Sequence, residues 1–176
     1  VSRDDFADDR LGLFGPMFEE MGHRARQHPD ALIFDMLSQG FTTLCFDGQN
    51  FFDTDHPSKD VAGSDVTVSN MAEGTEQPWF LMDTSRAIKP IIWQEREDYE
   101  FQTVNNHKDD QLFMTDMYKF GIRARVNAGF GLWQLAFASK QELNVDTYAA
   151  ARQQMMKQRG NEGRVLGVMP STLIVG

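Results

Sequence analysis

With 176 residues, 41% of them hydrophobic, the chain is long enough to bury a sizeable core without disulfide or metal cross-links. Its formal net charge of −9 argues against a protein that binds nucleic acid through the phosphates or attaches to an anionic membrane surface. Cys45 is the only cysteine, which excludes an intrachain disulfide, and no apolar run approaches the roughly 20 residues of a membrane span.

A helix is predicted over residues 9–40, where apolar side chains recur at spacings of three and four with one gap of seven. Asp8 and Asp9 are candidate N-caps, and Gly40 is a typical C-terminal stop. Pro29 bends this helix or divides it, so the pattern leaves open one long, kinked helix or two nearly collinear ones. The apolar positions are Leu11, Phe14, Phe18, Met21, Ala25, Leu32 and Met36.

The next segment, residues 42–77, has no regular apolar pattern. Asp47-Gly48 and His56-Pro57 are turn signals within it. Residues 58–74 are small and polar, which predicts a mobile loop.

Residues 79–140 predict mostly β-structure. The strongest signal is residues 118–126, where apolar side chains alternate with Lys119, Arg123 and Arg125 in the period of a half-buried strand. Pro90 indicates that the strand around it is an edge strand. The predicted strands are residues 88–96, 99–104, 118–126 and 130–138, the last apolar on both faces, with a polar turn at residues 105–110.

A second helix is predicted over residues 146–159, with Asn144 or Asp146 as its N-cap and Gly160 as its stop. A turn at residues 161–163 and a strand at residues 171–175 follow. The order of helix, strands, helix and strand predicts an α+β fold.

Two groups of residues could carry chemistry. Asp53, Asp55 and His56 offer oxygen and nitrogen ligands, so a metal site, and with it a small metal-dependent hydrolase, is one interpretation. The spacing matches no metal motif, however, and a polar turn closed by Pro57 is the simpler interpretation. Cys45 could also pair with a histidine as nucleophile and base, the candidates being His23, His28, His56 and His107, but a buried, inert thiol is the simpler interpretation.

Gly129-Phe130-Gly131 lacks the third glycine of a dinucleotide fingerprint, and close backbone packing explains it better. From the residues alone we therefore predict no catalytic, cofactor-binding or metal-binding residues.

A basic row, Lys119, Arg123 and Arg125, follows an acidic cluster along the chain. Cross-strand pairing or a solvated face is one interpretation, and complementary charge between neighbouring subunits is the other. The acidic cluster consists of Glu95, Glu97, Asp98 and Glu100.

Blocks of sequence spread along nearly the whole chain closely resemble the major head subunits of Mu-like phages, and they occur in the family's order. Three of the blocks are DGQNFFD at residues 47–53, DTSRAIKP at residues 83–90 and AGFGLWQ at residues 128–134. The loop at residues 59–76 matches poorly. The remaining matches are residues 1–6, Asp9, residues 11–12, Pro16, Phe18, residues 20–22, 29–30, 32–34, 56–57 and 94–96, Gly163, residues 166–167 and Pro170.

This resemblance implies a partial Hong Kong 97-type capsid fold and no enzymatic activity. Residues 1–176 would form one partial capsid-subunit domain, with a spine helix at about residues 9–40, a β-rich region at about residues 79–140, and a helix-strand part of the axial region at about residues 144–176. The function implied is a subunit that assembles with copies of itself, as hexamers and pentamers, into an icosahedral shell.

The resemblance also implies partners and a location. We expect scaffold, portal and other head proteins as partners, DNA enclosed without sequence-specific binding, no membrane and no cofactor. The protein would be made and assembled in the bacterial cytoplasm and would reside in the virion. A non-capsid binding module of a prophage is the remaining alternative.

The first residue is not methionine, and residues 171–176 end within an apolar strand pattern. We therefore expect an internal piece of a longer protein, without its N-terminal arm and extended loop, that assembles weakly or not at all by itself.

Overall fold

The computed structural model describes residues 1–9, 12–106, 110–160 and 163–176. The chain divides into two compact units. Unit 1 contains residues 1–34 and 93–128, and unit 2 contains residues 35–92 and 129–176. Predicted positions at Leu11 and His107, and parts of the predicted turns at residues 105–110 and 161–163, lie outside the described residues.

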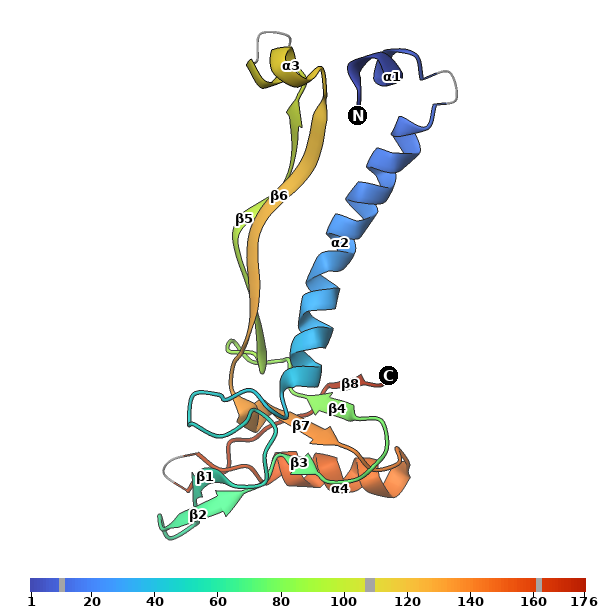
Figure 1. The fold of residues 1–176 in the computed structure, drawn as a ribbon. Helices are drawn as coiled ribbons and strands as arrows, with labels where there is room; N and C mark the ends of the chain where they lie inside the picture. The colour runs from blue at the N-terminus through green and yellow to red at the C-terminus, as the bar shows by residue number, and fades with distance from the viewer. Residues whose placement is uncertain (10–11, 107–109, 161–162) are drawn as a thin grey trace. The chain divides into compact units, whose positions relative to one another are not determined.

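The long helix is α2, Phe14–Gln39, and it supplies one side of unit 1 (Figure 1). The helix begins at Phe14, so the prediction of Asp8 or Asp9 as its N-cap residue was wrong. The Asp9 carboxylate nevertheless accepts hydrogen bonds from the backbone N–H groups of Leu13 and Phe14, at the start of α2, at 3.0 and 3.1 Å. Pro29 lies inside α2, and the helix runs through it, so there is one helix and not two. A separate short helix, α1, Arg3–Ala7, precedes it.

The other side of unit 1 is formed by most of a two-stranded sheet, whose strands are β5, Ile91–Val104, and β6, Lys119–Phe130. A short helix, α3, Asp110–Thr115, lies between the two strands along the chain (Figure 1). The alternation predicted for residues 118–126 is confirmed, because exposed and half-buried residues alternate from Ile122 to Ala128 in β6. The prediction of two strands at residues 88–96 and 99–104 was wrong, because β5 is continuous. Its charged residues are tolerated in mid-strand because they are exposed or, at Glu97, half-buried.

Aromatic side chains hold unit 1 together. Phe18 on α2 packs against Phe120 on β6 with ring centroids 4.6 Å apart, and Phe6 on α1 packs against Phe120 at 5.6 Å. Phe101 on β5 completes the contact with Phe18 at 5.9 Å. These rings are only partly covered, since Phe101 remains 49% exposed and Phe6 37% exposed.

Unit 2 contains a four-stranded sheet in the order β3-β7-β4-β8. β4 runs antiparallel to both β7 and β8, and β3 runs parallel to β7. The predicted strand at residues 171–175 is confirmed as β8. The strands are β3, Met71–Ala72; β4, Trp79–Met82; β7, Ala136–Ser139; and β8, Thr172–Ile174.

Both faces of the two central strands are buried, and the period of two along each strand divides its side chains between two core clusters. Phe80 and Met82 lie in one cluster with Phe51 and Phe52. Trp79, Leu81 and Phe137 lie in the other, which is covered by helix α4, Val145–Met156. The cap predicted at Asn144 is confirmed, because its side chain accepts from the N–H groups of Asp146 and Thr147.

Two predictions in this region were wrong. The predicted loop at residues 58–74 overlaps an antiparallel pair, β1, His56–Lys59, and β2, Asp65–Val68. These four-residue strands show no regular alternation of buried and exposed residues and so give little signal. The single covered strand predicted at residues 130–138 is interrupted by a short 3-10 helix, η1, Trp133–Leu135, which turns the chain between β6 and β7.

Candidate functional site

The polar cluster of unit 2 is formed by the loop that follows α2. Phe51 and Phe52 anchor this loop in the core with 0% and 1% of their surface exposed. The turn predicted at Asp47-Gly48 is confirmed by Gly48, whose φ of 88° favours glycine, and by a 2.8 Å hydrogen bond from Cys45 N–H to the carbonyl of Gln49.

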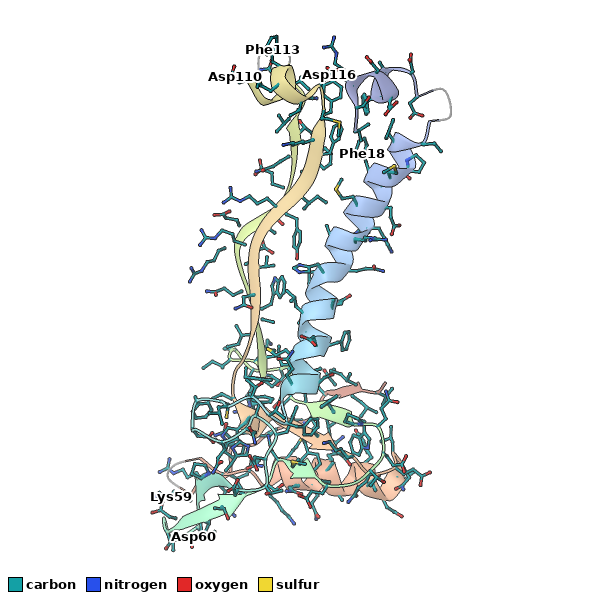
Figure 2. All side chains as sticks on the ribbon, viewed as in Figure 1. Phe18, Lys59, Asp60, Asp110, Phe113 and Asp116 are labelled. Carbon is teal, nitrogen blue, oxygen red and sulfur yellow. The ribbon has the colours of Figure 1, made fainter. Side chains whose placement is uncertain are left out.

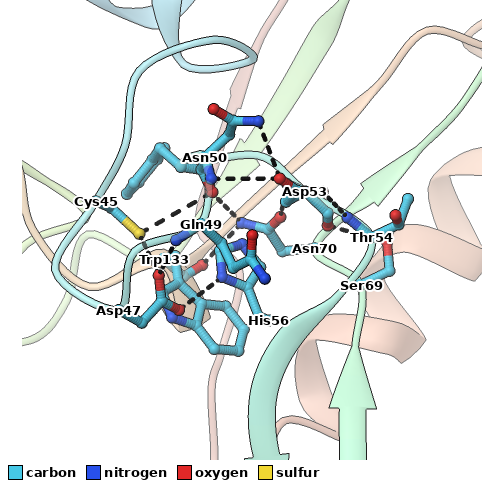
Figure 3. A network of polar contacts seen from close by, with 11 residues as sticks. Cys45, Asp47, Gln49, Asn50, Asp53, Thr54, His56, Ser69, Asn70 and Trp133 are labelled. Atoms are coloured by element: carbon cyan, nitrogen blue, oxygen red, sulfur yellow. Dashed lines mark hydrogen bonds and ion pairs between the residues drawn. The ribbon is translucent and has the colours of Figure 1, made fainter.

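Cys45, Asp47 and His56 meet at this turn (Figure 3). The two oxygens of Asp47 face different partners: Cys45 Sγ lies 3.0 Å from Oδ1, and His56 Nδ1 lies 2.8 Å from Oδ2. His56 is fully buried, and its ring stacks on Trp133 with centroids 3.9 Å apart. The cluster is therefore held by packing on one side and by the turn on the other.

The electrostatics of the cluster favour an ionised Asp47 and a neutral thiol. Burial would raise the pKa of the Asp47 carboxyl, but hydrogen bonds from Cys45 and His56 outweigh it and lower that pKa. Burial and the bond to Asp47 raise the pKa of Cys45 to about 11. Reactive cysteines have lowered pKa values, so Cys45 is a protonated hydrogen-bond donor at neutral pH and a poor nucleophile.

The interpretation of Asp53, Asp55 and His56 as one metal site was wrong, because the residues that lie beside His56 are Cys45 and Asp47. Asp53 Oδ2 accepts hydrogen bonds from the backbone and side-chain amides of Asn50, and Oδ1 accepts one from Thr54 N–H. Asp55 is exposed, and His56 bonds to Asp47. The pattern of neighbouring residues missed Asp47, because Asp47 lies nine positions before His56 in the sequence.

The histidines considered as partners for Cys45 bond to other residues or lie outside the described part of the chain. His56 lies in the same cluster but bonds to Asp47. Within unit 1, His23 bonds to Gln27, and His28 Nδ1 lies 2.6 Å from the hydroxyl of Tyr99. His107 lies outside the described residues.

Gly131 has the role of close packing expected of it. Its N–H donates to the carbonyl of Pro90 at 2.8 Å, and a Cβ at this position would lie 2.0 Å from the carbonyl oxygen of Lys89. Gly129 has no such neighbour within 4 Å.

The charged row of β6 pairs with β5 inside the chain. Glu97 binds Arg123 at 3.1 Å and Arg125 at 2.9 Å. This supports the cross-strand interpretation for these two arginines. All three side chains are at least 40% exposed, so the pairs contribute little to stability.

A second buried polar centre, at Asp83, was not singled out by sequence reasoning as a structural anchor. Asp83 is 1% exposed and accepts from Ser85 N–H, Ser85 Oγ and Met169 N–H at 3.0, 2.6 and 2.9 Å. Burial opposes ionisation, but these bonds and Arg86 lower the pKa of Asp83. Aspartate followed two residues later by serine is typical of such a side-chain-closed turn, and this was the available signal.

The most exposed apolar residues of unit 1 lie on α3. Phe113, which is labelled in Figure 2, is 85% exposed and Met114 is 80% exposed, whereas Leu112 beside them is buried. Among the helices that the structure describes, none is both long enough and apolar enough to cross a membrane.

Comparison with known proteins identifies relatives along the full chain. The model of the family described as Mu-like prophage major head subunit gpT matches residues 1–176. The chain is 44% identical over 181 aligned positions to the major capsid protein of Escherichia phage Mu, and 37% identical over 182 to the Mu-like prophage FluMu major head subunit of Haemophilus influenzae. Both alignments cover 99% of this chain and 59% of the relative.

Solved structures give the same result. A chain of the procapsid of bacteriophage JBD30 matches with a TM-score of 0.80 at 45% identity, and a chain of the JBD30 capsid matches with a TM-score of 0.81 at 26% identity. These matches cover 99% of this chain and 61% and 60% of those chains. The predicted α+β capsid architecture is thereby confirmed, and the chain spans about three fifths of the length of its relatives.

Proposed function

Because this chain belongs to the Mu-like prophage major head subunit family over residues 1–176, we propose that it is the larger part of a major capsid subunit of a Mu-like phage or prophage. The observation that carries the proposal is the likeness to a JBD30 procapsid chain, with a TM-score of 0.80 at 45% identity. The activity proposed is assembly into the shell that encloses the genome, and the family is a structural one. This disfavours both the hydrolase and the non-capsid binding module.

The surface of unit 1 supports a role in assembly. Leu112 is the one fully buried apolar residue of this unit that the structure describes, while Phe113, Met114 and Met17 are more than half exposed. Exposed apolar groups of this kind mark surfaces that other proteins cover. Repeated contacts between copies can each be weak, because many act together in a closed shell.

The partners we propose are copies of the subunit, arranged as hexamers and pentamers, together with scaffold, portal and other head proteins. In JBD30, minor capsid protein trimers decorate the capsid, and we propose proteins of that kind as further partners. The net charge of −9 suits enclosure of DNA without specific binding to it. Assembly would take place in the bacterial cytoplasm, and the finished subunit would reside in the virion.

We also propose the regional assignment derived from the resemblance. Helix α2 would lie within the spine at about residues 9–40, β4 to β7 within the β-rich region at about residues 79–140, and α4 with β8 within the axial part at about residues 144–176.

The test is electron microscopy of the full-length subunit, expressed alone and with its scaffold. We expect shells, rings or capsomer-like oligomers. The absence of all three would overturn the proposal. The 176-residue chain by itself should stay monomeric or associate weakly in light scattering, and a stable hexamer would contradict that expectation.

A further inference from the structure

The Cys45, Asp47 and His56 cluster offers one thiol, one carboxylate and one imidazole within a single turn. The three ligand atoms all lie within 4.8 Å of one another, and this is the one group of three such residues found in the described part of the chain. Zinc-type ions bind this mixture of sulfur, oxygen and nitrogen ligands.

The three side chains are held in place without an ion. The Asp47 carboxylate accepts a hydrogen bond from Gln49 N–H at 3.1 Å, which fixes the turn around it. The His56 ring lies flat against Trp133, at an interplanar angle of 11°. Ligands that are already positioned lose little conformational entropy when an ion binds.

In the structure, two hydrogen bonds to Asp47 join the three side chains. One proton lies on the contact between Cys45 and Asp47, and another on the contact between His56 and Asp47. A divalent ion in their place would release the Cys45 proton to solvent and shift the His56 ring proton from Nδ1 to Nε2. The ion would then face a thiolate, a carboxylate and a neutral imidazole. The two negative charges would balance the ion, which lowers the cost of placing it in a partly buried site.

The fold also leaves His56 incompletely satisfied. Nε2 of this fully buried ring has no hydrogen-bond partner in the structure. Nδ1 is the ring nitrogen that faces Asp47, so Nδ1 would bind the ion and Nε2 is free to hold the ring proton. Asp47 and Gln49 also line an adjoining cavity of about 780 Å³, from which a water molecule could reach the cluster.

We propose that Cys45, Asp47 and His56 bind one zinc-type divalent ion, with a water molecule from the adjoining cavity as the fourth ligand. The ion would join the turn after α2 to the first residue of β1. Its role is to stabilise unit 2, and the proposal is independent of whether the subunit assembles.

The test uses Co²⁺ as a spectroscopic probe of the purified, reduced protein. We expect one Co²⁺ per chain, with the near-ultraviolet absorption band of a cobalt–thiolate bond, and Zn²⁺ should displace it. Zn²⁺ should also raise the melting temperature. If neither the band nor a Zn²⁺-dependent rise in melting temperature is observed, the proposal is wrong.

Variants identify the ligands. Cys45→Ser should remove the band, and Asp47→Asn should weaken binding by more than the roughly 10- to 100-fold typical of losing a partner outside the ligand set. Asp65→Asn is the matched control, because Asp65 lines the same cavity and its side chain is 90% exposed. A loss in Asp65→Asn as large as that in Asp47→Asn would show unspecific attraction of cations and would overturn the proposal. Melting of each variant without metal checks that it is folded.

Discussion

In unit 2, side chains from both faces of β4 and β7 enter core clusters, whereas in unit 1 the packing depends on rings that stay partly exposed. Phe80 and Phe137 in unit 2 are 7% and 2% exposed, while Phe6 and Phe101 in unit 1 are 37% and 49% exposed. Hydrophobic stabilisation scales with the area removed from water. Unit 2 therefore has an internal source of stability, and unit 1 would depend more on what covers it in the assembly that we propose.

The strongest way to break this comparison is to make the same substitution in both units. Phe137→Ala should lower the free energy of unfolding by about 3–5 kcal/mol, because it removes a fully buried ring and leaves a cavity. Phe113→Ala, at a residue 85% exposed, should change it by no more than about 0.5 kcal/mol. Urea denaturation monitored by circular dichroism measures both.

The same pair separates stability from assembly. Phe113→Ala should reduce shell formation by the full-length subunit although it barely alters unfolding. Equal destabilisation by the two variants would show that the apolar residues of the units do not differ in the way proposed.

Backbone packing gives a second contrast. Gly131→Ala in unit 2 should cost about 2–3 kcal/mol, because the new methyl group would lie 2.0 Å from the carbonyl oxygen of Lys89 and the chain must shift. Gly121→Ala in unit 1 meets nothing within 4 Å and should be neutral or slightly stabilising. Thermal denaturation of the two variants provides the measurement, and a Gly121→Ala loss matching that of Gly131→Ala would contradict the contrast.

The buried Asp83 carboxylate gives a third contrast between the two units. Asp83→Asn should lower the free energy of unfolding by about 2 kcal/mol, because an amide N–H would replace an oxygen that now accepts hydrogen bonds in a site 1% exposed. The control is Asp30→Asn, on the exposed surface of α2 in unit 1, which should change stability by less than about 0.5 kcal/mol.

The same carboxylate predicts a dependence on pH. The folded-state pKa of Asp83 is lowered from 3.8, so its contribution to stability is present above that value and is lost as pH falls through the folded pKa. The free energy of unfolding should therefore fall below about pH 4. Asp83→Asn should show a shallower fall, and an unchanged slope would assign acid unfolding to other carboxyls.

Much of the regular structure could be predicted from periodicity. The long helix, the alternating part of β6, the capped helix α4 and β8 all carry strong local patterns over several residues. The β1 and β2 pair was missed because four-residue strands leave too few positions for a pattern. The break at η1 was missed because residues 130–138 are apolar throughout, so periodicity cannot separate a strand from a turn of helix.

The polar cluster was only half predictable. The signal at Asp47-Gly48 correctly placed one turn, but the turn predicted at His56-Pro57 was wrong, because these residues begin strand β1. The pairing of Asp47 with His56 depends on how the loop folds back over Trp133. Asp53, the nearer carboxylate in sequence, is occupied by Asn50 and Thr54. Contacts across a loop are set by tertiary packing, and no local pattern contains them.

The smallest expected effect concerns the charged face of unit 1. Glu97→Gln should lower the free energy of unfolding by less than about 1 kcal/mol, because the pairs with Arg123 and Arg125 are exposed and solvent screens them. High salt should reduce even this difference.

Reversing the charge of both arginines extends the test to assembly. If neighbouring subunits use this face, the double reversal should impair shell formation far more than Glu97→Gln does. Undiminished assembly would show that these charges pair only within the β5–β6 sheet. Neighbouring subunits would then contact unit 1 through its exposed apolar residues.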